Sequence, residues 1–127
     1  MVTTFIVDDS TAVRERLANL LSDIPEVHIV GQAQDGTTAV SEIRATAPDV
    51  VILDINLPGE NGIEVLRTIK GISPAPMVLM LTNYAHPLYW KKCMNEGADG
   101  FFDKSTEFHK TLDVFRSLVD RRKEAVH

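Results

Sequence analysis

The chain has 127 residues and a mass of 14.1 kDa, which suits one ordinary domain and leaves no room for two. Its apolar fraction of 44% and charged fraction of 24% exclude a wholly disordered, collagen-like or membrane-embedded protein. Cys93 is the only cysteine, which excludes an internal disulfide framework and a zinc site built from several cysteines. The net charge of -5 argues against a protein that mainly binds nucleic acid, because such proteins usually carry a basic face.

The charge is unevenly distributed along the chain. Residues 1–60 contain ten acidic and three basic side chains, whereas residues 61–127 contain eight acidic and ten basic ones. The chain reaches Asp8 before a signal-peptide core could form, and no apolar run approaches the length of about 18 residues that a membrane span needs. We therefore expect a cytoplasmic protein without membrane contact, and we ask where its excess acidic side chains lie.

Short apolar runs alternate with longer amphipathic stretches along the whole chain. In chain order, the first half predicts a strand at 5–7, a helix capped by Ser10 or Thr11 and stopped by Pro25, a strand at 27–33, a helix at 37–47 and a strand at 50–53. The second half predicts a loop at 57–62, a helix at 63–69, a strand at 77–81, a helix at 87–96, a strand at 100–103 and a last helix capped by Ser105 or Thr106. This alternation predicts an α/β fold with a parallel sheet covered by helices on both faces.

Side chains with useful chemistry stand at the carboxyl ends of four of the five predicted strands. They are Asp8 and Asp9 after the first strand, Asp54 after the third, Thr82 at the fourth and Lys104 after the fifth, whereas nothing comparable follows the second. Ligands bind open parallel sheets at the carboxyl ends of the strands. We therefore expect three carboxylates, a hydroxyl and an ammonium to converge on one edge.

This combination suits phosphoryl chemistry. Crowded carboxylates repel one another and favour a hard cation such as Mg²⁺ or Mn²⁺. One carboxylate can then attack a phosphoryl group and form an aspartyl phosphate, while the cation and the lysine neutralise the transferred oxygens. Each residue alone has an ordinary explanation, since aspartate often caps a helix and lysine is common on surfaces. The prediction therefore depends on the four strand ends taken together.

Four segments carry a resemblance to a known family. The runs at 5–9 (FIVDD), 50–62 (VVILDINLPGENG), 81–82 (LT) and 97–104 (GADGFFDK) resemble the receiver domain of two-component response regulators, a family that includes the chemotaxis regulator CheY. The resemblance covers essentially the whole chain, and its motifs are highly specific in combination. It implies a flavodoxin/CheY-like (βα)5 fold, which is a doubly wound, parallel, five-stranded sheet with strand order 2-1-3-4-5.

The resemblance also implies a phosphoacceptor and a metal site. Asp54 would be the phosphoacceptor. Asp9 would ligate Mg²⁺ directly, Asp8 would help mainly through water, and Asn56 would contribute its backbone carbonyl. The phosphoryl group would come from a phosphohistidine on a sensor histidine kinase or a histidine phosphotransfer protein. Slow self-hydrolysis would follow, and beyond this reaction on itself the chain would not be an enzyme.

Three further positions match residues that couple phosphorylation to a conformational change in the family. Thr82 would be the switch hydroxyl, Lys104 would pair with the phosphoryl group, and Phe101 would be the aromatic residue that turns inward on activation. The change would be a two-state switch, in which phosphorylation shifts an existing equilibrium through its contacts with Thr82 and Lys104.

The sequence departs from the common family pattern at several positions. Ser105 replaces the proline that usually follows the lysine, as it does in the NarL/LuxR branch, and Asn83 stands where a small residue usually follows Thr82. Tyr84 and Asn56 occupy the two positions at which the family tunes dephosphorylation, and an aromatic ring at Tyr84 would shield the phosphoryl group from water. We therefore predict a moderately long-lived phosphoryl state.

The predicted fourth helix carries Tyr89, Trp90 and the basic pair Lys91 and Lys92. The sequence leaves open whether Trp90 is exposed or lies in the core; an exposed aromatic residue beside basic ones is typical of an interface. In the receiver family, the usual output surface is formed by the fourth helix, the fifth strand and the fifth helix. A downstream protein target, or a second copy forming a homodimer, would bind there.

We interpret residues 1–127 as one receiver domain with no output domain, whose output is carried by a protein partner. One alternative is a truncated DNA-binding regulator of the NarL/LuxR type, whose gene would continue past His127. A second is a phosphorylation-independent pseudo-receiver, against which the intact acids, Thr82 and Lys104 argue. A third is a phosphatase or other hydrolase, because a fold does not determine a function.

Overall fold

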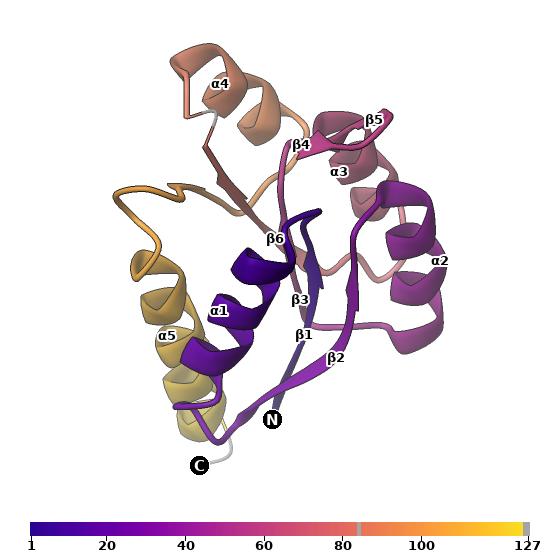
Figure 1. Cartoon of the computed structure of the whole chain (residues 1–127). Helices are drawn as coiled ribbons and strands as arrows, with labels where there is room; N and C mark the ends of the chain where they lie inside the picture. Colours follow the sequence, from indigo (N-terminus) through magenta and orange to yellow (C-terminus); the bar gives the residue numbers. More distant parts are fainter. Residues whose placement is uncertain (84, 126–127) are drawn as a thin grey trace.

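The computed structural model describes residues 1–83 and 85–125, which form helices and strands in alternation (Figure 1). The strands are β1 (Val2–Val7), β2 (Val27–Ala33), β3 (Val50–Leu53), β4 (Asn56–Leu57), β5 (Glu60–Asn61), β6 (Met77–Thr82) and β7 (Gly100–Asp103). The helices are α1 (Thr11–Leu21), α2 (Gly36–Thr46), α3 (Gly62–Lys70), α4 (Pro87–Asn95) and α5 (Lys110–Ala125). Across these ranges, the helices lack the combined length and apolar character that a membrane crossing requires.

Five of the strands form one parallel sheet in the order β2-β1-β3-β6-β7. Counted without the short strands β4 and β5, this is the predicted order 2-1-3-4-5, so the predicted fold class is confirmed. The register aligns the carboxyl ends of the strands, because Val7 is paired with both Ala33 and Leu53. The residues that follow β1 and β3 are therefore brought to the same edge of the sheet.

Helices cover both faces of the sheet (Figure 1). Buried residues of α1 and α5, such as Leu17 and Phe115, form one apolar cluster, and residues of α2, α3 and α4 form another. β3 contributes Val50 and Ile52 to the first cluster and its other two residues to the second. A central strand buried on both faces needs an uninterrupted apolar run, which explains why 50–53 is the clearest strand in the sequence.

Polar side chains determine where four of the helices begin. Ser10 caps α1 by accepting a hydrogen bond from the backbone N–H of Val13, at 3.2 Å, as one of the two predicted caps. Asp35 and Asn61 cap α2 and α3 in the same way, and the imidazole Nδ1 of His86 accepts from a backbone N–H of α4. These caps start the helices close to the carboxyl edge of the sheet.

Three predictions about local structure are wrong. The first helix is not stopped by Pro25, because α1 ends at Leu21. The last helix is not capped by Ser105 or Thr106, because α5 begins at Lys110. Instead, the backbone N–H and the hydroxyl of Ser105 both donate to Oδ1 of Asp103, at 2.8 and 2.6 Å, and close a turn after β7. The predicted loop at 57–62 contains an antiparallel ribbon, in which β4 pairs with β5.

Asp49 precedes β3 and connects the amino end of this strand to the carboxyl end of α5. Its carboxylate pairs with Arg122, with 3.1 Å between Oδ1 and Nη2, and accepts from the backbone N–H of Thr3 at 2.8 Å. Partial burial acts to raise the pKa of Asp49, but the hydrogen bonds from Arg122 and Thr3 hold it below its ordinary value. The charged form of Asp49 therefore stabilises the fold.

Asp49→Asn is expected to lower the free energy of unfolding by about 1 kcal/mol near neutral pH. Because the folded-state pKa is depressed, this contribution is present above the unfolded pKa of about 3.9 and is lost as the pH falls through the folded value. Urea unfolding of the wild type and the variant, between about pH 7 and pH 2, measures the difference. A difference that does not shrink at low pH would show that the charge of Asp49 contributes nothing.

Candidate functional site

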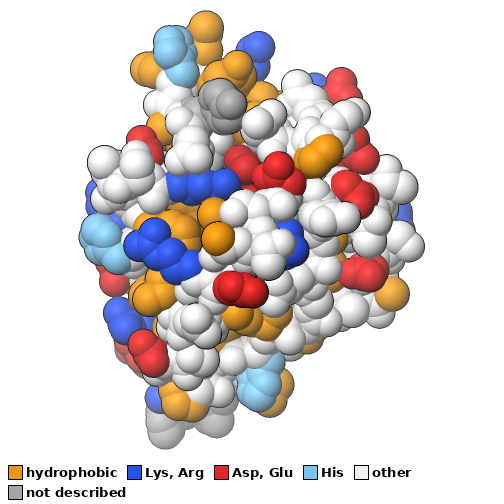
Figure 2. Space-filling view, viewed as in Figure 1, with side chains coloured by type: hydrophobic (Ala, Val, Ile, Leu, Met, Phe, Trp, Pro, Cys, Tyr) orange, Lys and Arg blue, Asp and Glu red, His pale blue; other side chains and the backbone are white. Residues whose placement is uncertain are grey.

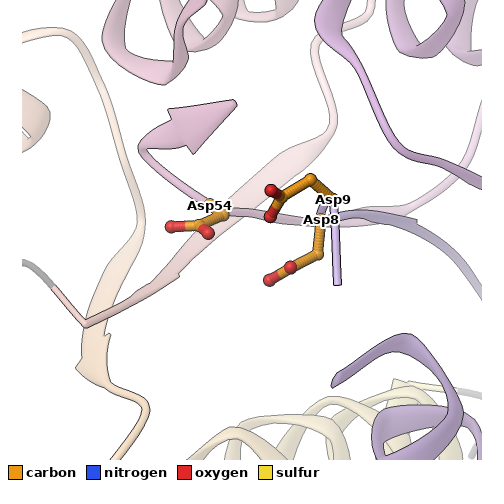
Figure 3. Close-up of side chains that lie close together, drawn as sticks. All are labelled: Asp8, Asp9 and Asp54. Carbon is orange, nitrogen blue, oxygen red and sulfur yellow. The ribbon is translucent and has the colours of Figure 1, made fainter. Parts of the chain in front are cut away.

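The structure brings the three predicted acids together at the carboxyl edge of the sheet. Asp8 and Asp9 follow β1, Asp54 follows the neighbouring strand β3, and one ligand oxygen from each lies within 4.8 Å of the others (Figure 3). The backbone N–H of Asp54 donates to the carbonyl of Val7 at 3.1 Å, which joins the two strand ends. Asp8 and Asp54 are buried and Asp9 is exposed, so the cluster opens to solvent on one side.

Lys104 enters the same cluster from the carboxyl end of β7. Its Nζ lies 2.7 Å from Oδ2 of Asp8 and 2.8 Å from Oδ2 of Asp54, with side-chain exposures of 9%, 4% and 5% for the three residues. Burial acts to lower the pKa of Lys104, but the two carboxylates outweigh it and raise the pKa above its ordinary value. An acidic patch and a basic one lie side by side on this face of the molecule (Figure 2).

Burial makes the charged form of the Asp8 carboxylate costly. Burial is the largest influence and raises its pKa, although Lys104 and a hydrogen bond from the backbone N–H of Ser10, at 2.9 Å, act in the opposite direction. Lys104 therefore pairs with two buried carboxylates that lie beside a third, exposed one. Such a cluster gains from further positive charge, because buried carboxylates repel each other.

The donor set fits Mg²⁺. Mg²⁺ prefers hard oxygen ligands and is usually held by one or two carboxylates together with water and phosphate oxygens. Asp8, Asp9 and Asp54 supply carboxylate oxygens close enough to share one ion. The backbone N–H of Asn56 donates to Oδ1 of Asp54 at 3.3 Å, so this residue also lies beside the cluster.

Thr82 lies on β6, the neighbour of β3, and Phe101 lies on β7, the next strand and the edge of the sheet. Thr82 is the last residue of β6, is fully buried and pairs in register with Asp103, directly before Lys104. The backbone N–H of Lys104 donates to the carbonyl of Thr82 at 3.0 Å. Phe101 is half-buried on β7 and packs against the cluster formed by α2, α3 and α4. Tyr84, the predicted shield of the phosphoryl group, lies outside the described residues.

The sequence left the exposure of Trp90 open, and the structure resolves it. Leu88, Tyr89 and Trp90 are three of the exposed large apolar residues, with Trp90 exposed to 52%. Apolar side chains gather at the α4 end of the molecule (Figure 2). Cys93 instead faces the core, as the sequence favoured, and burial raises the pKa of its thiol to about 11.

Two residues that shape the site had no assigned role in the sequence analysis. Glu60 accepts hydrogen bonds from the start of α2, and Gly62 lies against the backbone that follows β3. A Cβ atom on Gly62 would lie 2.3 Å from the carbonyl oxygen of Asp54. The only sequence signal for either residue is the richness of 57–62 in turn-forming residues, which does not identify their partners.

A comparison with models of known protein families shows to which family the chain belongs. Residues 4–116 match the family described as the response regulator receiver domain. The chain is a member of this family. The predicted resemblance is therefore confirmed, and the acidic cluster lies at the carboxyl edge of a receiver fold.

Known proteins similar to this receiver domain include regulators and other receivers. The DNA-binding transcriptional activator DevR/DosR of Mycobacterium tuberculosis is 35% identical over 98% of this chain, which spans only 60% of that protein's length. The signal receiver domain of the putative response regulator NarL from Mycobacterium tuberculosis superposes with a TM-score of 0.81 at 29% identity, covering 96% of both chains. CheY in a CheX–CheY–BeF3–Mg complex from Borrelia burgdorferi gives 0.78 at 27% identity, covering 90% of this chain and 89% of that one.

Proposed function

We propose that this receiver domain accepts a phosphoryl group on Asp54 from a phosphohistidine on a sensor histidine kinase or a phosphotransfer protein. The observation that carries the proposal is the position of the Asp54 carboxylate. It is buried, it lies within reach of two further carboxylates, and its Oδ2 pairs with Lys104 at 2.8 Å. A carboxylate held beside a cation site and an ammonium is prepared to attack an anionic phosphoryl group.

In the proposed reaction, an oxygen of Asp54 forms a bond to phosphorus while the bond between phosphorus and the histidine nitrogen breaks. The histidine leaves with its electron pair, and Asp54 becomes an acyl phosphate. Asp8, Asp9, Asp54 and the backbone carbonyl of Asn56 would hold Mg²⁺, which would supply positive charge to neutralise the phosphoryl oxygens.

Lys104 and Thr82 would contact the phosphoryl group and so couple phosphorylation to a conformational change. Lys104 exchanges its contact with the Asp54 carboxylate for the phosphoryl oxygens, and the hydroxyl of Thr82 binds a phosphoryl oxygen. Both residues lie at the carboxyl edge and are joined through the backbone hydrogen bond from Lys104 to Thr82. Phe101 lies on β7, the strand that ends just before Lys104. Its side chain turns inward when the segment around Thr82 moves. Water then releases the phosphoryl group slowly.

The output surface in this proposal is centred on α4. Leu88, Tyr89 and Trp90 are exposed on this helix beside Lys91 and Lys92, and exposed apolar side chains in one place are typical of a protein-binding surface. A downstream protein, or a second copy of this receiver, would bind the face formed by α4, β7 and α5.

A second candidate function is the receiver part of a DNA-binding regulator. DevR/DosR is described as a DNA-binding transcriptional activator, and this receiver domain spans only 60% of its length. In such a protein, phosphorylation of Asp54 would control a separate DNA-binding domain. Both candidates use the same chemistry at Asp54 and differ in what receives the signal.

Beryllofluoride binding tests the proposed site, because this ion mimics a phosphoryl group on an aspartate. Trp90 fluorescence should change when beryllofluoride and Mg²⁺ are added together, since Trp90 lies on the helix that follows Thr82. Asp54→Asn, which removes the acceptor oxygen, should show no change, and neither should the wild type in beryllofluoride without Mg²⁺. A parallel calorimetric titration keeps the test valid if Trp90 is insensitive. The same heat of binding from Asp54→Asn as from the wild type would disprove the site.

A further inference from the structure

The ribbon formed by β4 and β5 is attached at three points. It contains Asn56, whose carbonyl the proposed function assigns to Mg²⁺, and it connects Asp54 to α3. The backbone N–H of Gly62 donates to the carbonyl of Ile55 at 2.7 Å, and the side chain of Asn61 caps α3. The third attachment is the carboxylate of Glu60, which reaches a different part of the molecule.

Glu60 binds the amino end of α2. Its Oε1 accepts from the backbone N–H of Thr37 at 3.2 Å and from the hydroxyl of the same residue at 2.8 Å. The first turn of a helix has free N–H groups and a positive end of its dipole, so a carboxylate is a suitable partner there. Glu60 thus caps a helix that begins 24 residues before it, in addition to the local cap Asp35.

The start of α2 has the shape that this contact needs. A Cβ atom on Gly36 would lie 1.9 Å from Oε2 of Glu60 and 2.5 Å from a methyl group of Val65. Only a glycine leaves room for the carboxylate in the position described. The hydrogen bonds place the carboxylate at the turn between β2 and α2, and the absence of a side chain on Gly36 leaves room for it there.

We propose that Glu60 is a positioning residue for the cation site. By fixing β5 to α2, it holds the paired strand β4, and with it the backbone of Asn56, in the position that Mg²⁺ requires. This inference rests on the proposed function, because it takes the cluster of Asp8, Asp9 and Asp54 as the Mg²⁺ site. It also gives the carboxyl end of β2 a role, since the turn after β2 supports the ribbon rather than the ion.

The expected consequence is a change in Mg²⁺ affinity. A ribbon that is already held in place loses little conformational freedom when the ion binds, whereas a free ribbon must be ordered at that moment. Residues that orient the ligands of a metal typically change its affinity by tenfold or more. Because Thr37 is exposed and Glu60 is partly exposed, we expect an effect at the lower end of that range.

Calorimetric titration with MgCl₂ tests this proposal. Glu60→Ala should raise the Mg²⁺ dissociation constant by about tenfold. Glu60→Gln, which keeps an acceptor for Thr37, should recover most of the affinity. Glu64→Ala is the matched control, because it removes the same charge from a residue lining the same surface groove, and it should change the dissociation constant by less than about twofold.

Hydrogen exchange of the Mg²⁺-free protein provides a second measurement. In Glu60→Ala the amides of residues 56, 57 and 59–62 should exchange faster, while those of β3 should not change. If Glu60→Ala does not fold, Thr37→Val replaces it, because this variant removes one donor from the other side of the contact. A smaller rise in the dissociation constant, of about threefold, is expected for it.

The outcomes separate the two proposals. If the wild type binds no Mg²⁺, the proposed function fails. If the wild type binds Mg²⁺ and Glu60→Ala has the affinity of Glu64→Ala, the positioning role fails while the proposed function stands. Weaker binding in both Glu60→Ala and Glu64→Ala would mean that loss of negative charge, and not the contact with α2, sets the affinity, which also overturns the positioning role.

Discussion

Lys104→Met is expected to lower the free energy of unfolding by about 3 kcal/mol near neutral pH in the absence of divalent cations. Lys104 lies between Asp8 and Asp54, and all three side chains are almost fully buried. Removing the ammonium leaves two buried carboxylates close together without their common counter-ion. Breaking a buried pair costs more than the pair contributed, because the remaining buried charges lose their counter-ion and are poorly solvated.

The matched control is Lys92→Met, which removes the same charge from an exposed position on α4. Urea unfolding of both variants should show a loss for Lys104→Met alone, and Mg²⁺ should restore part of it by supplying positive charge to the same carboxylates. Equal stability of the two variants without Mg²⁺ would contradict the view that Lys104 is the counter-ion of the cluster.

Gly62→Ala is expected to lower the free energy of unfolding by about 3 kcal/mol. The new methyl group would lie 2.3 Å from the carbonyl oxygen of Asp54 and 2.5 Å from the Cα of Ile55. Both are backbone atoms, so no side chain can rotate away, and either α3 or the segment after β3 must move. The second movement would also displace Asp54, so phosphoryl acceptance should fall together with stability.

Gly71→Ala is the control for this substitution. Gly71 caps the other end of the same helix with φ of -81°, which any residue adopts, and its nearest neighbour would be an ordinary contact at 3.4 Å. Its free energy of unfolding should change by less than about 1 kcal/mol, because alanine reduces the freedom of the unfolded chain without a clash. Urea unfolding that finds the same loss in both variants would contradict the steric explanation.

The sheet and the convergence of the site residues were predictable because they follow from short-range patterns. An uninterrupted apolar run such as 50–53 identifies a strand buried on both faces, and alternation with helices implies a parallel sheet. Once the strands are parallel, their carboxyl ends share an edge. The approach of Asp8, Asp54 and Lys104 then follows from their positions in the chain, and only their distances required the structure.

Other features depended on contacts that the sequence does not reveal. Serine is a common helix cap, but the hydroxyl and the backbone N–H of Ser105 both donate to the nearby carboxylate of Asp103 instead. Glu60 lies among turn-forming residues, and its contact with Thr37 exists only after α2 has packed against the ribbon. The exposure of Trp90 was undetermined because only Cys93 of α4 is fully buried, which leaves a weak apolar pattern.

The most direct test of the proposed function is the intact mass of the protein after incubation with acetyl phosphate and Mg²⁺. The wild type should gain one phosphoryl group per chain, and the gain should disappear when Mg²⁺ is chelated. Asp54→Asn, which has nearly the same shape but no acceptor carboxylate, should gain none. A folded, Mg²⁺-bound wild type that gains no mass from acetyl phosphate, or from a phosphoramidate donor, would contradict the assignment of Asp54. A gain of equal size in Asp54→Asn would contradict it as well.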